Sequence, residues 1–134
     1  MAQIEAKSLQ KMFKVDENPD IPTIMDVLRK SSWALDQPFK TVEASGKRAV
    51  LSIDRYRTQE TRLSKGLDEF PCKKVRFGYL KNFAKMLNAN VKVKCIICPP
   101  DKHPKDSWCK WEFALILGVY IMFSNISRLV SLTE

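Results

Sequence analysis

The sequence is poor in the residues from which catalytic and phosphate-binding motifs are built. It has one histidine and four glycines among 134 residues. No glycine-rich phosphate loop and no pair of carboxylates stands out as an active site. The histidine, His103, lies next to a proline, and a single histidine is a weak signal for acid–base catalysis. We therefore expect a protein that is not an enzyme.

Long apolar segments and targeting signals are also missing. The longest apolar run covers residues 113–123, and as a helix it would cross only about 16 Å of a bilayer core that is about 30 Å thick. The N-terminal residues include Glu5 and have no apolar stretch of the kind found in secretory signals. We expect an intracellular protein, cytoplasmic or nuclear, that is not secreted and has no transmembrane span.

Acidic residues are absent between Glu69 and Asp101, and most of the excess positive charge lies in this gap. The chain has 23 Lys+Arg against 15 Asp+Glu, a net charge of +8. Residues 1–39 carry a net charge of −1, residues 40–94 carry +9 and residues 95–134 carry zero. Solvated surfaces usually mix both signs, so a block of one sign indicates a surface that attracts polyanions.

The pattern of apolar residues predicts one small α+β domain over residues 1–134. The N-terminal helix lies within residues 1–15 and could attach loosely, because residues 16–20 have the composition of a linker. The other expected elements, in chain order, are a helix over 22–33, a β-hairpin that pairs 38–43 with 49–53 across a turn at 44–47, a loop or short helix over 57–69, a basic amphipathic helix over 76–88 and a strand over 91–97.

The last expected element is a buried central helix from Ser107 to Phe123. This segment is apolar on nearly all sides, as is typical of a helix surrounded by protein. A change to a strand past Gly118 is the alternative.

The expected helix over 76–88 carries a ridge of lysines. On a helical wheel the apolar side chains fall on one broad arc, and the basic side chains Lys74, Lys81 and Lys85 fall opposite to it. In the strand over 91–97, alternation places Lys92 and Lys94 on the face that points outward.

These features lead us to expect a small basic protein that binds RNA or single-stranded nucleic acid through its phosphate backbone. Aromatic rings near the basic block, at Tyr56, Phe77 or Tyr79, could stack on bases. Small size and strong basicity are also typical of viral accessory or structural proteins. The candidate nucleic-acid-binding residues are Arg48, Arg55, Arg57, Lys73, Lys74, Arg76, Tyr79, Lys81, Lys85, Lys92 and Lys94.

Three other interpretations of the basic block remain open at this point. The block could lie on an anionic membrane surface, where each basic residue contributes on the order of 1 kcal/mol. The protein could instead be a self-associating, matrix-like scaffold that forms homo-oligomers. It could also be an adaptor that meets an acidic protein partner.

The second candidate site is a cluster of metal-ligand residues. The four cysteines are expected as thiols or metal ligands rather than disulfides, because no secretory signal precedes them. The spacing of Cys95, Cys98, His103 and Cys109 is similar to that of a zinc knuckle, with a last gap one residue longer. Four such ligands within fifteen residues would suit a tetrahedral structural zinc ion. The alternative is that these residues are buried thiols and a loop histidine.

Overall fold

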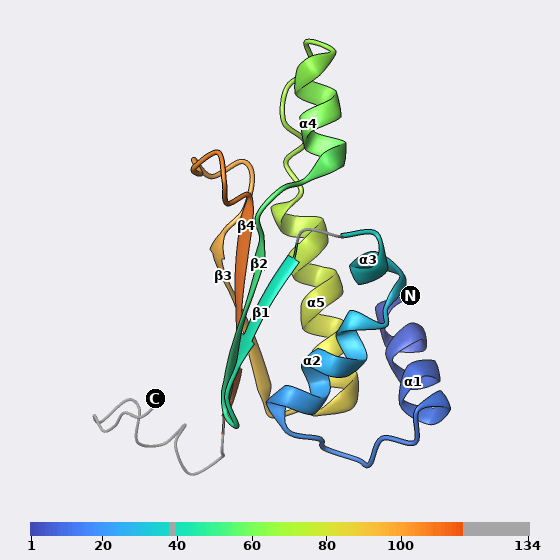
Figure 1. Cartoon of the computed structure of the whole chain (residues 1–134). Helices are drawn as coiled ribbons and strands as arrows, with labels where there is room; N and C mark the ends of the chain where they lie inside the picture. Colours follow the sequence, from blue (N-terminus) through green and yellow to red (C-terminus); the bar gives the residue numbers. More distant parts are fainter. Residues whose placement is uncertain (38–39, 117–134) are drawn as a thin grey trace, which may run out of the picture.

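The computed structural model describes residues 1–37 and 40–116 of the chain. It has the α+β architecture predicted from the sequence: a four-stranded antiparallel sheet with helices on one face (Figure 1). The elements are α1 (Ala2–Met12), α2 (Ile21–Arg29), α3 (Ser32–Leu35), β1 (Lys40–Ala44), β2 (Arg48–Ile53), α4 (Arg57–Ser64), α5 (Lys73–Leu87), β3 (Val91–Ile97) and β4 (Cys109–Leu115). Within the described ranges, each helix is too short or too polar to cross a bilayer.

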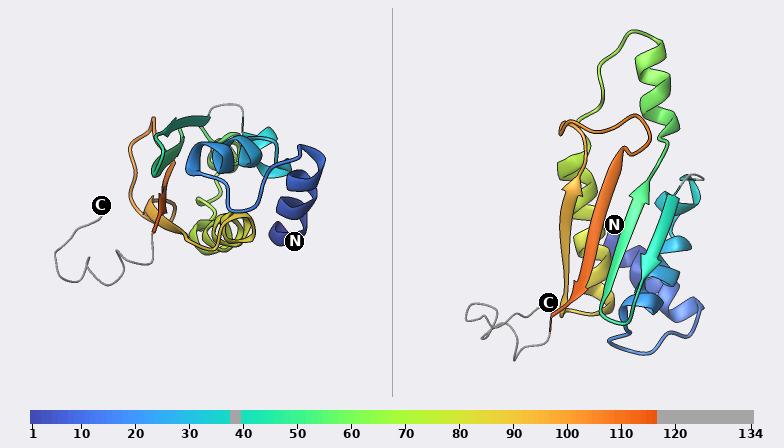
Figure 2. Two further views of the ribbon diagram at one scale, coloured as in Figure 1. Left: turned by 90° about the horizontal axis from the view of Figure 1, so that it is seen from below. Right: turned by 60° about the vertical axis from the view of Figure 1, so that its left-hand side comes forward.

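The last strand in the chain occupies an inner position in the sheet. The strand order is β1-β2-β4-β3, and every neighbouring pair is antiparallel. Because register partners share a face of the sheet, Trp111 of β4 lies between Leu51 of β2 and Cys95 of β3. Figure 2 shows the four strands side by side, with α1, α2 and α5 behind them.

The prediction of a buried central helix from Ser107 to Phe123 is wrong, because residues 109–115 form the strand β4. The inward side chains Cys109, Trp111 and Phe113 are buried, and they alternate with side chains on the outer face. A short apolar run does not distinguish a buried strand from a buried helix by its periodicity. Pairing with strands on both sides satisfies the backbone of β4, as burial requires. The expected continuation of this segment past residue 116 lies outside the described residues.

The hairpin and the strand over 91–97 form as the sequence predicted. β1 pairs with β2 across a turn at 45–47, where the Ser45 N–H donates to the Arg48 carbonyl at 2.8 Å. In β3, Val91 and Val93 are buried whereas Lys92 and Lys94 are exposed. The alternation of side chains was therefore sufficient to predict both elements.

Side-chain caps mark where α2 and α3 begin. The Asp20 carboxylate accepts the Thr23 N–H at 3.0 Å and starts α2. The helix expected over 22–33 is in fact two, because the Ser31 hydroxyl accepts the Ala34 N–H at 3.2 Å and starts α3. A serine with extended backbone is a preferred N-cap, so it starts a second helix instead of continuing the first.

The core lies between the sheet and the helix layer. Figure 2 shows α1, α2 and α5 on the same side of the sheet. α5 contributes its buried residues Leu80, Phe83, Ala84 and Leu87, and the half-buried Phe77 ring stacks on Trp111 with a centroid distance of 6.1 Å. α1 packs against α5 with Ala2, Ala6 and Gln10 buried.

A short helix projects beyond the end of the sheet. α4 extends away from the body of the molecule (Figure 1), and its returning segment is held by the buried side chain of Gln59. The Gln59 amide accepts the Phe70 N–H and donates to the Phe70 carbonyl, both at 2.8 Å. This pair of hydrogen bonds fixes the chain directly before α5.

We predict that Trp111→Ala destabilises the protein by about 3–5 kcal/mol, because the substitution leaves a large cavity in the fully buried centre of the sheet. Urea unfolding followed by circular dichroism measures the change. Ile96→Ala is the matched control in the neighbouring strand, since Ile96 is 47% exposed, and a cost below about 1 kcal/mol is expected there. Equal costs for the two variants would contradict the central position of β4.

Candidate functional sites: a basic edge and a buried cysteine cluster

The lysine ridge forms on α5 as the helical wheel predicted. We call Lys74, Lys81 and Lys85 the basic ridge; all three are exposed. The Lys81 ammonium lies 5.6 Å from the centroid of the Phe77 ring, which in turn stacks on Trp111 of the sheet. Lys81 therefore lies next to the ring of α5 that contacts the sheet.

The basic ridge lies beside an edge strand that carries two further lysines. β3 is the outermost strand and packs against α5. Lys92 and Lys94 point away from the helix layer, because they alternate with the buried Val91 and Val93. The ridge is on the helix side of β3 and these two lysines are on its open side. We call the five lysines together the basic edge.

Three of the predicted nucleic-acid-binding residues form ion pairs within the molecule. Lys73 pairs with Asp101 and Arg55 pairs with Glu60, each with a closest N···O distance of 3.0 Å. Arg48 pairs with Glu112 of the adjacent strand β4. Asp101 and Glu112 lie outside the acid-free stretch of sequence, and the fold brings them back to the basic residues. The net positive field near these three residues is reduced accordingly.

Arg57 lies on α4, away from the basic edge. It is exposed at the start of that helix, where it lines an open depression of about 370 Å³ together with Thr61, Arg62 and Lys65. The helix α4 itself projects beyond the end of the sheet (Figure 1).

Arg76 and Tyr79 point toward α1 and α3. The Arg76 guanidinium lies 4.6 Å from the centroid of the Trp33 ring and 5.6 Å from that of Tyr79. The Tyr79 hydroxyl donates to the Glu5 carboxylate. Burial, together with this hydrogen bond, raises the pKa of Tyr79 to about 12. Both side chains therefore hold the helix layer together.

None of the three aromatic rings proposed to stack on bases is freely exposed. Tyr56 is buried, Phe77 stacks on Trp111, and Tyr79 packs near Trp33 and Phe83. Stacking on bases needs an accessible ring face. What the structure presents to a polyanion is thus charge rather than an aromatic platform.

Three cysteines from distant parts of the chain meet in the core. Cys72 directly precedes α5, Cys98 follows β3 and Cys109 begins β4. The sulfur of Cys98 lies 3.5 Å from that of Cys72 and 3.4 Å from that of Cys109. All three residues are buried, and their sulfur atoms lie within 4.8 Å of one another. We call these residues the cysteine cluster.

Electrostatics within the cluster favour one anionic sulfur. Contacts with the thiols of Cys109 and Cys98 lower the pKa of Cys72 to about 3, and the positive charge of Arg76 acts in the same direction. Contacts with Cys109 and Cys72 raise the pKa of Cys98, and the contact with Cys72 raises the pKa of Cys109. A sulfur at the start of a helix is also stabilised as a thiolate by the helix dipole.

The cysteine cluster differs from the ligand set proposed from the sequence. Cys98 and Cys109 are shared by both sets, and Cys72, 26 residues before Cys98, replaces the other two. Cys95 lies on the inner face of β3 beside Trp111 and is only half-buried. Spacing within a short motif could not indicate Cys72, since only the packing of α5 on the sheet brings it in.

His103 is held in a separate site of its own. Its Nε2 lies 3.0 Å from a carboxylate oxygen of Glu69, and its Nδ1 lies 2.8 Å from the carbonyl oxygen of Pro104. Its ring packs against Trp108, with a centroid distance of 4.3 Å. A carbonyl oxygen only accepts, so Nδ1 donates to it. Both ring nitrogens thus have partners other than a metal.

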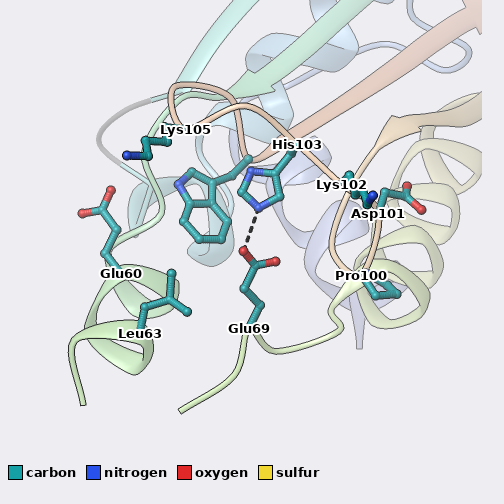
Figure 3. Close-up of a pocket in the computed structure, with 9 residues that line it drawn as sticks. Glu60, Leu63, Glu69, Pro100, Asp101, Lys102, His103 and Lys105 are labelled. Atoms are coloured by element: carbon teal, nitrogen blue, oxygen red, sulfur yellow. Dashed lines mark hydrogen bonds and ion pairs between the residues drawn. The ribbon is translucent and has the colours of Figure 1, made fainter. Parts of the chain in front are cut away.

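His103 and Glu69 line an open depression of about 690 Å³ (Figure 3). Side chains of both charge signs surround it, among them Glu60, Asp101 and Lys105. Its lining offers no hydroxyl or thiol that the histidine could activate as a nucleophile. The geometry is that of a histidine that ties the loop after β3 to the segment before α5.

Residues 1–115 match the model of a family of unknown function, DUF6125. The chain belongs to the DUF6125 family. No curated protein and no solved structure matches it. The DUF6125 match extends from α1 to the end of β4, so it contains the basic edge and the cysteine cluster.

We predict that Glu5→Gln destabilises the protein by about 1–2 kcal/mol at pH 7, because the Glu5 carboxylate accepts the Ser32 N–H at 2.7 Å and the Tyr79 hydroxyl. These hydrogen bonds outweigh desolvation and lower the pKa of Glu5 from its ordinary 4.5. The stabilisation is therefore present above pH 4.5 and is lost as the pH falls through the lowered pKa.

Urea unfolding at several pH values tests this prediction, and the stabilities of the two proteins should converge as the pH falls. Glu17→Gln is the control, because the Glu17 carboxylate is exposed and lies 3.9 Å from Lys7. It should change stability by less than about 0.5 kcal/mol. A pH-independent difference for Glu5→Gln would contradict the charged hydrogen bonds as its cause.

Proposed function

We propose that this DUF6125 protein binds nucleic acid through its phosphate backbone, using the basic edge as the contact surface. One observation carries the proposal: five exposed lysines lie on α5 and on the adjacent strand β3, and none forms an ion pair with a carboxylate of residues 1–37 or 40–116. The five are Lys74, Lys81, Lys85, Lys92 and Lys94. Lys94 lies opposite Glu112 in the β3–β4 register, but the Glu112 carboxylate forms its ion pair with Arg48.

The dimensions of the basic ridge suit a phosphate backbone. Lys74 and Lys85 are eleven residues apart on one helix, which corresponds to about 16 Å along its axis. One strand of a duplex carries a phosphate about every 3.4 Å of axis, so the ridge spans about five phosphates. Lysine ammonium groups on flexible stems adapt to phosphates without requiring a fixed geometry.

Charge without accessible rings favours a mode of binding that does not read bases. The aromatic residues near the ridge pack inside the protein, so phosphate contacts would supply the affinity. We propose RNA or single-stranded DNA as the partner. The lysines lie on both sides of the β-strand β3, and a flexible single-stranded phosphate backbone could bend to contact both groups. Weak sequence preference and steep salt dependence follow from this mode.

We predict that replacing Lys74, Lys81 and Lys85 with Glu abolishes binding to single-stranded RNA at physiological salt, because three of the five contacts become repulsive. For the wild-type protein, a plot of log affinity against log salt should have a slope of about −3.5, which is about −0.7 for each of five contacts. Fluorescence anisotropy of a labelled RNA over a series of salt concentrations measures both effects.

The matched control replaces Lys7, Lys11 and Lys14, which are exposed on α1 and its end, with Glu. This control changes the net charge by the same amount but leaves the basic edge intact. It should therefore lose less than about 10-fold in affinity. Equal losses in the two variants would overturn the basic edge as the site. Binding to anionic vesicles but not to RNA or single-stranded DNA would favour the membrane surface instead. Binding to none of these would favour an acidic protein partner.

A further inference from the structure

We propose that the cysteine cluster is a binding site for a thiophilic metal ion, with Zn²⁺ as the first candidate and Cys72, Cys98 and Cys109 as ligands. This site is separate from the basic edge and does not depend on the proposed function. Thiolates are the preferred ligands of Zn²⁺ in structural sites, and three of them leave one coordination position for a further ligand.

The distances between the sulfur atoms suit one shared ion. Zn–S bonds of about 2.3 Å in tetrahedral geometry place two sulfur ligands about 3.8 Å apart. The two shorter separations in the cluster are 3.4 and 3.5 Å, so each pair needs to open by only a few tenths of an ångström. They are too long for a disulfide, in which the sulfurs are about 2.05 Å apart.

Backbone hydrogen bonds hold the cluster in position. The Lys73 N–H, next to Cys72, donates to the Pro99 carbonyl, next to Cys98, at 3.0 Å. The Asp101 N–H donates to the Cys98 carbonyl at 2.9 Å, and the Asp101 carboxylate accepts the Cys98 N–H at 3.2 Å. The start of β4 is fixed by the Trp108 N–H, which donates to Ile53 at 2.8 Å. The ligands are thus preorganised, which lowers the cost of binding an ion.

Groups that surround the three sulfur atoms favour negative charge on them. The Gln59 amide approaches the Cys72 sulfur at 3.9 Å, and its orientation is fixed by its two hydrogen bonds to Phe70. Arg76 and the N-terminus of α5 add positive charge on the same side of the cluster. Three thiolates and one Zn²⁺ carry a net charge of −1, which these groups partly neutralise. Outer-shell donors of this kind tune the affinity of metal sites.

His103 and Cys95, two of the four ligands proposed from the sequence, do not belong to the cysteine cluster. His103 has partners on both ring nitrogens, so we do not include it. Cys95 shares the inner face of the sheet with Trp111 and lies three residues before Cys98. The group of sulfur atoms that lie within 4.8 Å of one another holds Cys72, Cys98 and Cys109 and does not include Cys95. We therefore do not assign Cys95 as a ligand, and the fourth position is open to water or another external ligand.

Titration of the full-length protein with Zn²⁺ and, separately, with Co²⁺ under reducing, metal-free conditions tests the proposal. Native mass spectrometry should show one zinc ion per chain. The Co²⁺ form should show a strong thiolate-to-cobalt charge-transfer band in the near ultraviolet, together with the visible bands of tetrahedral cobalt. Addition of a chelator should remove the ion and lower the melting temperature, because the metal binds the folded state only.

Cys98→Ser and Cys109→Ser should each lower the zinc affinity at least about 100-fold, whereas Cys95→Ser should retain three thiolates and bind more tightly than either. Circular dichroism checks that the variants are folded.

The variant in which Lys74, Lys81 and Lys85 are all replaced by Glu should bind zinc as the wild type does, which separates this proposal from the proposed function. If a variant does not fold, the cobalt spectrum of the wild-type protein still decides. A wild-type protein that binds no zinc, or a cobalt form without the charge-transfer band, would overturn the site. Unchanged affinity in Cys98→Ser would do the same.

Discussion

The insertion of β4 between β2 and β3 is the constraint on which the rest of the structure depends. Its inward residues Trp111 and Phe113 are buried at the centre of the sheet face on which the helix layer packs. Phe77 of α5 stacks directly on Trp111, so the central strand also fixes the rotation of α5. That rotation leaves the ridge lysines exposed to solvent and places Lys81 over the Phe77 ring. Cys109 lies at the start of the same strand, and its position brings it to Cys98.

The two candidate sites differ in their exposure to solvent, and this changes how strongly charges act in each. The basic edge is exposed, so solvent and salt screen each lysine and only their number gives a strong field. The cysteine cluster is buried, where a single charge has a large effect on its neighbours. Edge strands often carry lysines simply to prevent pairing with other sheets, and this is a second physical role for Lys92 and Lys94. The three lysines of α5 have no such role and carry more of the functional argument.

Periodicity was sufficient to predict much of the fold and part of the basic edge. The hairpin, β3 and the two-sided character of α5 all follow from alternation or helical spacing in one segment. The type of the 109–115 segment did not follow, because it is buried between two partners and its apolar run suits either state. The grouping of cysteines was predicted only in part: Cys98 and Cys109 lie close together, but the third sulfur beside them is that of Cys72.

By itself, the sequence determined which face of each local element is apolar and where positive charge gathers along the chain, because both depend on residues close together in sequence. The tertiary structure alone decided which charges remain free and which thiols meet. Asp101 forms an ion pair with Lys73 and Glu112 forms one with Arg48, and the sulfur of Cys72 contacts that of Cys98. These contacts join segments far apart in the chain, and they exist only because the packing of α5 and β4 closes the loops between them.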